Sequence, residues 1–265
     1  MENIFLPSKI ELKEGETKNE GILVIEPLFH GYGTTLGNAL RRVLLSSLPG
    51  AAVTSFKLKG ATHEFSTLKG IYEDILEIVL NLKQLRLKVY SQEPIVLKLV
   101  KKGEGEVYAK DITKDANVDI INSDLKIATI TDKNTELNME ITVEKGMGFE
   151  PTENRNKTDL PVGSIAIDAI FTPIADVGFK VENTRVGQIT NYDKLILTVK
   201  TDGTISPEHA LNSAVKILLD HFNLLYKPDL PVESRKEADE EPAKKATKAK
   251  KITKKPVSAK AGVKK

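Results

Sequence analysis

The chain has 265 residues, a formal net charge of +2, 40% hydrophobic residues and no cysteine. These values fit a globular protein of one or two domains and exclude disulfides, thiolate metal sites and cysteine nucleophiles. No apolar run reaches the roughly 20 residues that span a bilayer, and no secretory signal is recognisable at the N-terminus, so we expect a cytoplasmic protein that does not bind a membrane.

The first predicted helix follows Gly31-Tyr32-Gly33, with Thr34 or Thr35 as its N-cap, and ends at Pro49-Gly50. Apolar residues three and four positions apart predict an amphipathic helix; they are Leu36, Ala39, Leu40, Val43 and Leu44. Leu45 and Leu48 widen this apolar stripe beyond what one core usually needs. The only charged residues of the helix are Arg41 and Arg42.

A second helix is predicted to begin with Ser66 or Thr67 as its cap. Its apolar face would consist of Leu68, Ile71, Ile75, Ile78, Val79 and Leu82. Three acidic residues, Glu73, Asp74 and Glu77, are expected on the opposite face, in solvent.

The third helix has the clearest start, because Ser206 is a favoured N-cap and Pro207 is a favoured first residue. Its apolar residues recur at helical period and are Ala210, Leu211, Ala214, Val215, Leu218, Leu219 and Phe222. Since the first and third helices are apolar around more than half of their circumference, each needs cover on two sides. A partner subunit would provide that cover, and so would a deeply buried position within one domain.

Most of the remaining chain alternates between apolar and polar residues, which predicts β-strands. The predicted strands are residues 21–28, 53–59, 85–90, 95–100, 137–144, 164–171, 179–182 and 195–201. Long runs of strands with only three helices predict the α+β class.

Charge is divided unevenly along the chain. Every acidic residue lies at or before Glu241, and residues 243–265 contain ten lysines. The preceding 242 residues hold 29 basic and 37 acidic residues, a net charge of −8. The composition of the tail is typical of disordered segments that bind nucleic-acid phosphates irrespective of sequence, although a merely solubilising tail is the alternative. The lysines expected to contact DNA are Lys244, Lys245, Lys248, Lys250, Lys251, Lys254 and Lys255.

Known catalytic patterns are missing from the sequence. It has no P-loop, no G-x-S-x-G nucleophile elbow and no dinucleotide-binding glycine pattern. His63-Glu64 lacks a second histidine at zincin spacing, and His209 and His221 are too far apart to share a metal. We therefore expect no catalytic residue, no metal site and no cofactor, and predict an assembly or binding protein.

Three blocks, in order, resemble the bacterial RNA polymerase alpha-subunit family. They are TTLGNALRRVLLSSLPG at residues 34–50, HEFST with EDILEI and NLK within residues 63–83, and DKL with GTISPE within residues 193–208. The resemblance implies a dimerisation subdomain of residues 1–49 and 174–229, with a mostly β subdomain of residues 50–173 inserted between them. Residues 230–265 would be a linker and the basic tail.

The resemblance also implies partners. The first and third helices of two copies would pack together through Leu36, Leu40, Val43, Leu44, Leu211, Val215, Leu218 and Phe222. The homodimer would recruit the beta and beta-prime subunits, with sigma factor, omega subunit and DNA also present in the complex. The nucleotidyltransferase activity would belong to that complex, so catalytic residues are not expected in this chain.

By position, Arg42 matches the arginine central to beta-subunit docking, with Thr35, Asn38 and Arg41 on the same element. Lys83 matches another beta contact, and Lys194 matches the beta-prime side. Arginine suits such contacts because its planar guanidinium forks onto carboxylates or carbonyls.

The sequence departs from the family after about residue 232, where typical members continue through a linker into a helical DNA-binding domain. Here Glu233–Glu241 resembles the acidic linker, and the lysine-rich tail follows. We hypothesise that the tail provides a nonspecific DNA contact in place of that domain, in a nucleoid-associated enzyme. The alternative reading of the chain is a free-standing, nonspecific nucleic-acid-binding protein.

Overall fold

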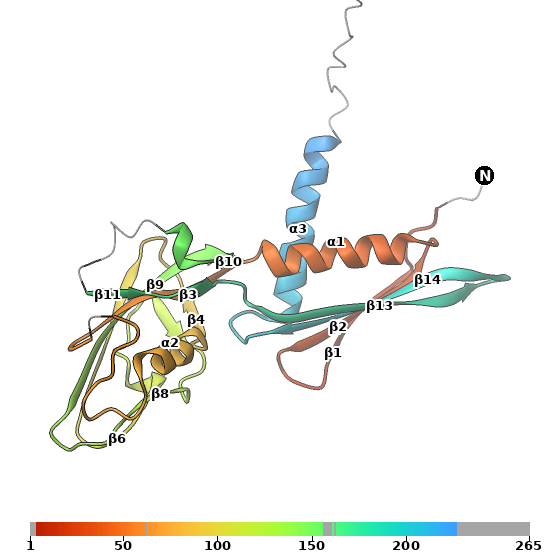
Figure 1. The fold of residues 1–265 in the computed structure, drawn as a ribbon. Coiled ribbons are helices and arrows are strands. Elements are labelled where there is room, and N and C mark those ends of the chain that lie inside the picture. Colours follow the sequence, from red (N-terminus) through yellow and green to blue (C-terminus); the bar gives the residue numbers. More distant parts are fainter. Residues whose placement is uncertain (1–3, 62, 156–160, 162, 227–265) are drawn as a thin grey trace, which may run out of the picture. The chain divides into compact units, whose positions relative to one another are not determined.

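The computed structural model describes residues 4–61, 63–155, 161 and 163–226. Within these residues the chain forms three α-helices and fourteen β-strands, which confirms the α+β class (Figure 1). No helix in the described ranges has the length and hydropathy needed to cross a membrane.

Helix α1 (Tyr32–Ser46) begins four residues before the predicted Leu36. Gly31 precedes it with φ of 84°, a left-handed conformation that glycine adopts without steric cost. No side chain of the helix caps its own N-terminus. The predicted caps, Thr34 and Thr35, are therefore wrong, because both residues lie inside the first turns.

Helix α2 (Ile75–Lys83) is shorter than predicted and begins after Asp74, whose side chain accepts a hydrogen bond from the N–H of Glu77 at 2.7 Å. The predicted cap at Ser66 or Thr67 is wrong. Gly70 has φ of 83° and interrupts the helical period there. Glu73 is also not in solvent, since it is only 3% exposed.

Helix α3 (Pro207–Leu225) begins where the sequence predicted. The hydroxyl of Ser206 accepts a hydrogen bond from the N–H of His209 at 3.3 Å, and Pro207 occupies the first turn. This start depends only on neighbouring residues, which is why sequence reasoning located it.

The first sheet joins segments from both ends of the chain. Its antiparallel order is β1 (Lys9–Glu14), β2 (Glu20–Leu28), β14 (Ile189–Thr201) and β13 (Ile174–Val186). Helices α1 and α3 share a hydrophobic core with β13 and β14, and the last turns of α3 extend past α1 (Figure 1). Members of that core include Leu40, Leu44, Leu197, Val199, Ala210 and Ala214.

A second and larger hydrophobic core is built from the middle of the chain. Its four-stranded sheet has the order β11 (Ser164–Ala166), β3 (Pro49–Leu58), β9 (Glu136–Met147) and β5 (Ile95–Lys102). Helix α2 packs into this core through Ile75, Ile78 and Leu82, against Phe56 and Ile141 among others.

Three two-stranded sheets complete the described structure. They pair β4 (Leu87–Val89) with β7 (Val118–Ile120), β6 (Gly105–Tyr108) with β8 (Lys126–Ile130), and β10 (Phe149–Glu150) with β12 (Ala169–Ile170). The predicted strand at 164–171 is therefore divided into β11 and β12. Strands β1, β6, β7, β8 and β10 were not predicted.

Candidate functional site

The outer face of α1 carries the four polar residues expected to meet a partner. Thr35, Asn38, Arg41 and Arg42 are all exposed, whereas Gly33, Gly37, Leu40 and Leu44 of the same helix are buried. The ion pairs among the described residues involve neither Arg41 nor Arg42. Both guanidinium groups are therefore available to an external carboxylate or carbonyl.

Two glycines allow α1 to lie directly against the sheet. A Cβ on Gly33 would lie 2.9 Å from Cγ1 of Val181, and a Cβ on Gly37 would lie 2.6 Å from Cδ2 of Phe179. Both separations are too short for any side chain larger than hydrogen. Sequence reasoning included Gly37 in a family block but assigned no contact to either glycine.

A buried carboxylate on β14 caps α1. Oδ2 of Asp193 accepts hydrogen bonds from the N–H of Gly31 at 2.9 Å and from the N–H of Gly33 at 3.0 Å. Negative charge at a helix N-terminus is favoured by the helix dipole and by the unpaired N–H groups there. Because Asp193 lies 160 residues after Gly33 in the sequence, local patterns did not reveal it as the cap.

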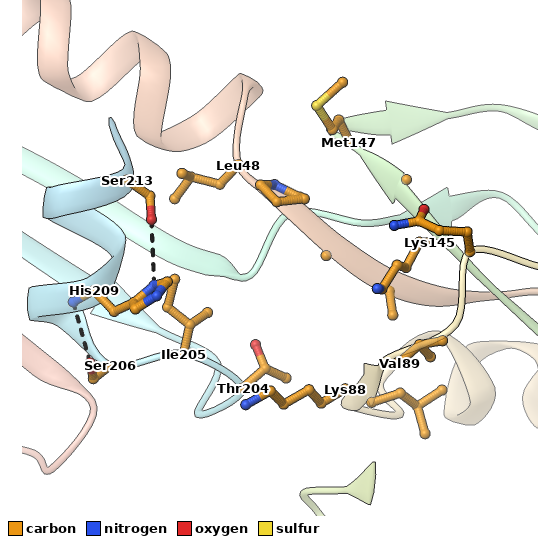
Figure 2. Close-up of a pocket in the computed structure, with 16 residues that line it drawn as sticks. Leu48, Lys88, Val89, Lys145, Met147, Thr204, Ile205, Ser206, His209 and Ser213 are labelled. Atoms are coloured by element: carbon orange, nitrogen blue, oxygen red, sulfur yellow. Dashed lines mark hydrogen bonds between the residues drawn. The ribbon is translucent and has the colours of Figure 1, made fainter. Parts of the chain in front are cut away.

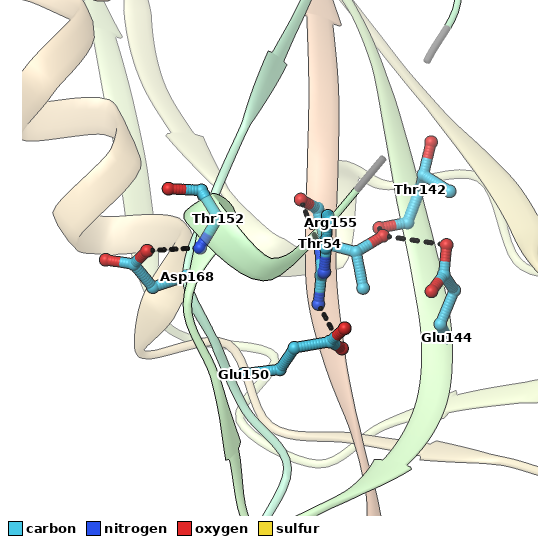
Figure 3. Close-up of polar contacts among 7 residues, drawn as sticks. All are labelled: Thr54, Thr142, Glu144, Glu150, Thr152, Arg155 and Asp168. Atoms are coloured by element: carbon cyan, nitrogen blue, oxygen red, sulfur yellow. Dashed lines mark hydrogen bonds and ion pairs between the residues drawn. The ribbon is translucent and has the colours of Figure 1, made fainter. Parts of the chain in front are cut away.

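Lys83, at the end of α2, is held by an internal ion pair. Its Nζ lies 3.0 Å from Oδ2 of Asp168. Oδ1 of Asp168 accepts a hydrogen bond from the N–H of Thr152 at 2.9 Å (Figure 3). The N–H of Thr152 and the ammonium of Lys83 hold the pKa of the Asp168 carboxyl below its usual range. Lys83 therefore differs from Arg42, because its charge already has a partner within the chain.

A neighbouring polar network fastens the short 3₁₀ helix at Thr152–Asn154 to β3. The guanidinium of Arg155 donates to the carbonyl of Thr54 at 3.0 Å and to Oε2 of Glu150 at 3.1 Å. The hydroxyl of Thr54 in turn donates to Glu144 at 3.1 Å (Figure 3). Sequence reasoning singled out none of these residues, whose partners lie up to 101 positions apart.

Lys194 lies on the first sheet, beside the cap of α1. Asp193 and Leu195 both approach glycines of α1, so alternation along the strand directs Lys194 to the other face. Its Nζ lies 3.7 Å from Oε2 of Glu26, and its side chain is 31% exposed. The structure thus places the expected beta-prime residue on the opposite face of the sheet from α1.

The eight apolar residues expected in a dimer interface divide into three groups. Leu40, Leu44 and Leu211 are buried in the chain's own core, at 6%, 0% and 6% exposure. Val43 and Leu218 pack against that core and are partly buried. Leu36, Val215 and Phe222 are exposed, at 37%, 40% and 60%.

Sequence reasoning did not include several other exposed apolar residues in that interface. Leu219 is 53% exposed, and beyond it the helix end is exposed at Leu224, Leu225 and the following Tyr226. We call Leu36, Val215, Leu219, Phe222, Leu224 and Leu225 the exposed apolar set of α1 and α3. The first four recur at helical period in the sequence, whereas Leu224 and Leu225 lie outside that stripe. The exposure of all six depends on which helix face meets the sheet.

A cavity of about 640 Å³ lies near the start of α3. Its lining comes from the α1–β3 junction, β4, β9 and α3, and includes Lys88, Lys145 and His209 (Figure 2). Nδ1 of His209 lies 3.4 Å from the hydroxyl of Ser213, and Nζ of Lys145 donates to the carbonyl of Tyr90 at 2.9 Å. No three acidic or histidine side chains in the described part of the chain converge as metal ligands would.

The seven tail lysines expected to contact DNA, from Lys244 to Lys255, lie outside the described residues. Their proposed role therefore depends on the sequence alone.

Comparisons with known proteins agree on one family. The sequence model of the family described as "RNA polymerase Rpb3/RpoA insert domain" matches residues 55–172. A protein named DNA-directed RNA polymerase subunit alpha from Oceanobacillus iheyensis is 52% identical over 217 residues, which cover 82% of this chain and 69% of that protein. Proteins of the same name from Alkaliphilus oremlandii and Symbiobacterium thermophilum are 51% and 53% identical, over 82% and 85% of this chain and 68% and 73% of those proteins.

Proposed function

This chain belongs to the family of DNA-directed RNA polymerase alpha subunits, and from that premise we propose that it is the homodimeric assembly subunit of its polymerase. A member of this family is a subunit of DNA-directed RNA polymerase, and the polymerase activity is that of the complex. In our proposal, two copies of the chain form a platform that recruits the beta and beta-prime subunits. Sigma factor, omega subunit and DNA join the same complex.

We assign the dimerisation subdomain to residues 1–49 and 174–229 and the inserted subdomain to residues 50–173. Two features support this division. One hydrophobic core combines residues from near both ends of the chain, such as Leu44 and Leu197, whereas the other is built from residues 53–167. The sequence model of the insert domain matches residues 55–172, which fall within the proposed inserted subdomain of residues 50–173.

Dimerisation is supported above all by the exposure of Phe222 and its neighbours. Large apolar side chains exposed at successive turns of one helix are typical of a protein–protein interface. An obligate dimer interface has the composition of a domain core. A second copy would cover the exposed apolar set, while Leu40, Leu44 and Leu211 would support it from beneath.

Docking of the beta subunit is proposed at the outer face of α1. Arg42 is the central residue, with Thr35, Asn38 and Arg41 beside it. This face is exposed and presents two guanidinium groups that pair with no carboxylate among the described residues. Arginine is enriched among interface residues that contribute most to binding.

Two weaker contacts are assigned to lysines. Lys83 contributes less to beta docking, because Asp168 already holds its ammonium. Lys194 is our proposed contact for the beta-prime subunit, since the opposite face of the sheet from α1 would receive a different partner.

Co-purification with affinity-tagged beta and beta-prime subunits tests this proposed function. We expect two copies of this chain for each copy of the two large subunits, measured by quantitative mass spectrometry. The free-standing nucleic-acid-binding alternative predicts a different result. In that case the chain would bind DNA by itself and would capture neither large subunit.

The basic tail is proposed to contact DNA phosphates without sequence preference. Its ten lysines contrast with the net charge of −8 that precedes them. If about six lysines meet phosphates of duplex DNA, the logarithm of the binding constant should fall with the logarithm of salt concentration with a slope of roughly −5.

This proposal is tested by comparing polymerase assembled with the full chain and polymerase assembled with residues 1–242. We expect the shortened chain to weaken promoter binding at low salt and to make the salt dependence shallower. A full-length control with glutamine in place of all ten tail lysines should behave like the shortened chain. Unchanged affinity and slope in both variants would contradict a DNA contact.

A further inference from the structure

We propose that Asp193 is a positioning residue for capture of the beta subunit, because its carboxylate sets where α1, and therefore Arg42, lies on the sheet. This inference rests on the proposed docking role of the outer face of α1. It assigns no contact between Asp193 and the partner, since Asp193 is only 7% exposed.

Helix α1 relies on a strand for its cap. Gly31 has no side chain with which to accept the free N–H groups, and no side chain of α1 replaces it. A single oxygen, Oδ2 of Asp193, accepts from the N–H of Gly31 and from that of Gly33, at 2.9 and 3.0 Å. Charge-assisted hydrogen bonds to a buried carboxylate are stronger and more restrictive in geometry than neutral ones.

Asp193 also limits the position of α1 sterically. A Cβ on Gly33 would lie 3.0 Å from Oδ2 and 3.1 Å from Cβ of Asp193. The helix therefore already touches the side chain that caps it and cannot move closer to β14. The hydrogen bonds oppose movement away from the strand, so the same residue limits α1 in both directions.

The stiffness of the helix connects its capped end to Arg42. Arg42 follows Gly33 by nine residues, which corresponds to roughly 13 Å along the axis. The contact between Gly37 and Phe179 lies between them and provides a pivot about which the stiff helix tilts. A shift at the capped end therefore changes the position at which Arg42 meets its partner.

The competing interpretation is that Asp193 only stabilises the fold. Two substitutions distinguish the possibilities. Asp193→Asn keeps an oxygen that can accept both hydrogen bonds, whereas Asp193→Ala removes the acceptor. Asp111 provides a matched control in the other core, since it is a partly buried acid that accepts from the N–H of Tyr108 at 2.9 Å and from Lys101 at 2.6 Å.

The experiment measures the affinity of the full-length dimer for purified beta subunit, together with the dimer mass and thermal midpoint of each variant. We expect Asp193→Ala to lose on the order of tenfold in affinity, which corresponds to about 1.4 kcal/mol. Asp193→Asn should remain within about threefold of the original, because it keeps an acceptor for the N–H groups of α1. Asp111→Ala should lower the thermal midpoint without changing the affinity.

A double substitution tests whether Asp193 acts through Arg42. We expect Asp193→Ala to cause a clearly smaller additional loss when Arg42 is already alanine, because the contact that depends on the position of Arg42 has then already been removed. Full additivity of the two losses would overturn the proposal. So would an Asp193→Ala dimer that binds the beta subunit as tightly as the original, or an Asp193→Asn dimer that loses as much as Asp193→Ala. If the unaltered dimer failed to bind the beta subunit, the proposed function itself would be wrong, which is a separate result.

Discussion

Gly37 of α1 and Phe179 of β13 pack so closely that a Cβ on the glycine would lie 2.6 Å from Cδ2 of the ring. We expect Gly37→Ala to lower the free energy of unfolding by about 1–3 kcal/mol, because overpacking forces the ring or the helix to move. Gly178→Ala is the matched control, since nothing lies within 4 Å of its added Cβ. Denaturant unfolding of both variants measures the difference, and equal losses would contradict the close packing of α1.

Glu73 is expected to stabilise the loop before α2 in a pH-dependent manner. Its carboxylate accepts from the N–H of Thr129 at 2.5 Å and from the Thr129 hydroxyl at 2.8 Å, with Lys126 3.4 Å away. Burial acts to raise its pKa, but the hydrogen bonds from Thr129 and Lys126 outweigh burial and hold the pKa below its ordinary value of 4.5. We expect Glu73→Gln to cost about 1–3 kcal/mol at neutral pH, because Thr129 loses its charged acceptor.

The sign of the pH dependence follows from the lowered pKa of Glu73. The stabilisation is complete above the unfolded pKa and is lost as the pH falls through the folded pKa, because protonation is then easier in the unfolded chain. The difference in unfolding free energy between the original chain and Glu73→Gln should therefore shrink in acid. A difference that stayed constant or grew as the pH fell would disprove the assignment.

Arg42→Ala should weaken capture of the beta subunit while leaving the dimer intact. Truncation of a central interface arginine commonly costs about 2 kcal/mol or more in binding. Lys98→Ala, at an exposed position of β5, controls for the loss of one positive charge. Pull-down affinity and sedimentation measure the two properties separately. Loss of the dimer in Arg42→Ala would mean that the faces of α1 have been assigned incorrectly.

Lys83→Ala should affect stability more clearly than docking. The ion pair with Asp168 is partly exposed, at 27% and 36% for the two side chains, so its loss should cost less than about 1 kcal/mol. We expect a smaller loss of beta capture than for Arg42→Ala, measured in the same pull-down. An equally large loss of capture, with unchanged unfolding, would instead identify Lys83 as a principal contact.

Phe222→Asp and Leu44→Asp should fail in different ways. Phe222 is 60% exposed in the single chain, so the aspartate would be buried only in the dimer and should dissociate it into folded monomers. Leu44 is fully buried, so the same change should unfold the chain itself. Circular dichroism and sedimentation together distinguish these outcomes. A stable Phe222→Asp dimer would remove Phe222 from the interface.

The elements predicted correctly are those whose signals are local. The start of α3 depends on Ser206 and Pro207, and strand β9 depends on an alternating run of neighbouring residues. The start of α1 was misplaced because its cap, Asp193, comes from a distant strand. The position of Glu73 was wrong for the same reason, since Thr129 holds it from β8.

The candidate site was predictable in composition but not in orientation. The outer-face residues, including Arg42, could be named from the sequence, and the structure exposes them. Periodicity could not decide which apolar residues face the sheet. Leu36 and Leu40 belong to the same stripe, yet only Leu36 is exposed. Contacts that require tertiary proximity, such as Lys83 with Asp168, left no pattern in the sequence.

The mass of the purified chain in solution is the most direct test of the proposed platform. Sedimentation equilibrium at micromolar concentration should give twice the 29.2 kDa of one chain, because the exposed apolar set of α1 and α3 needs a second copy as cover. A well-folded species of 29.2 kDa that shows no tendency to associate would contradict the assembly role.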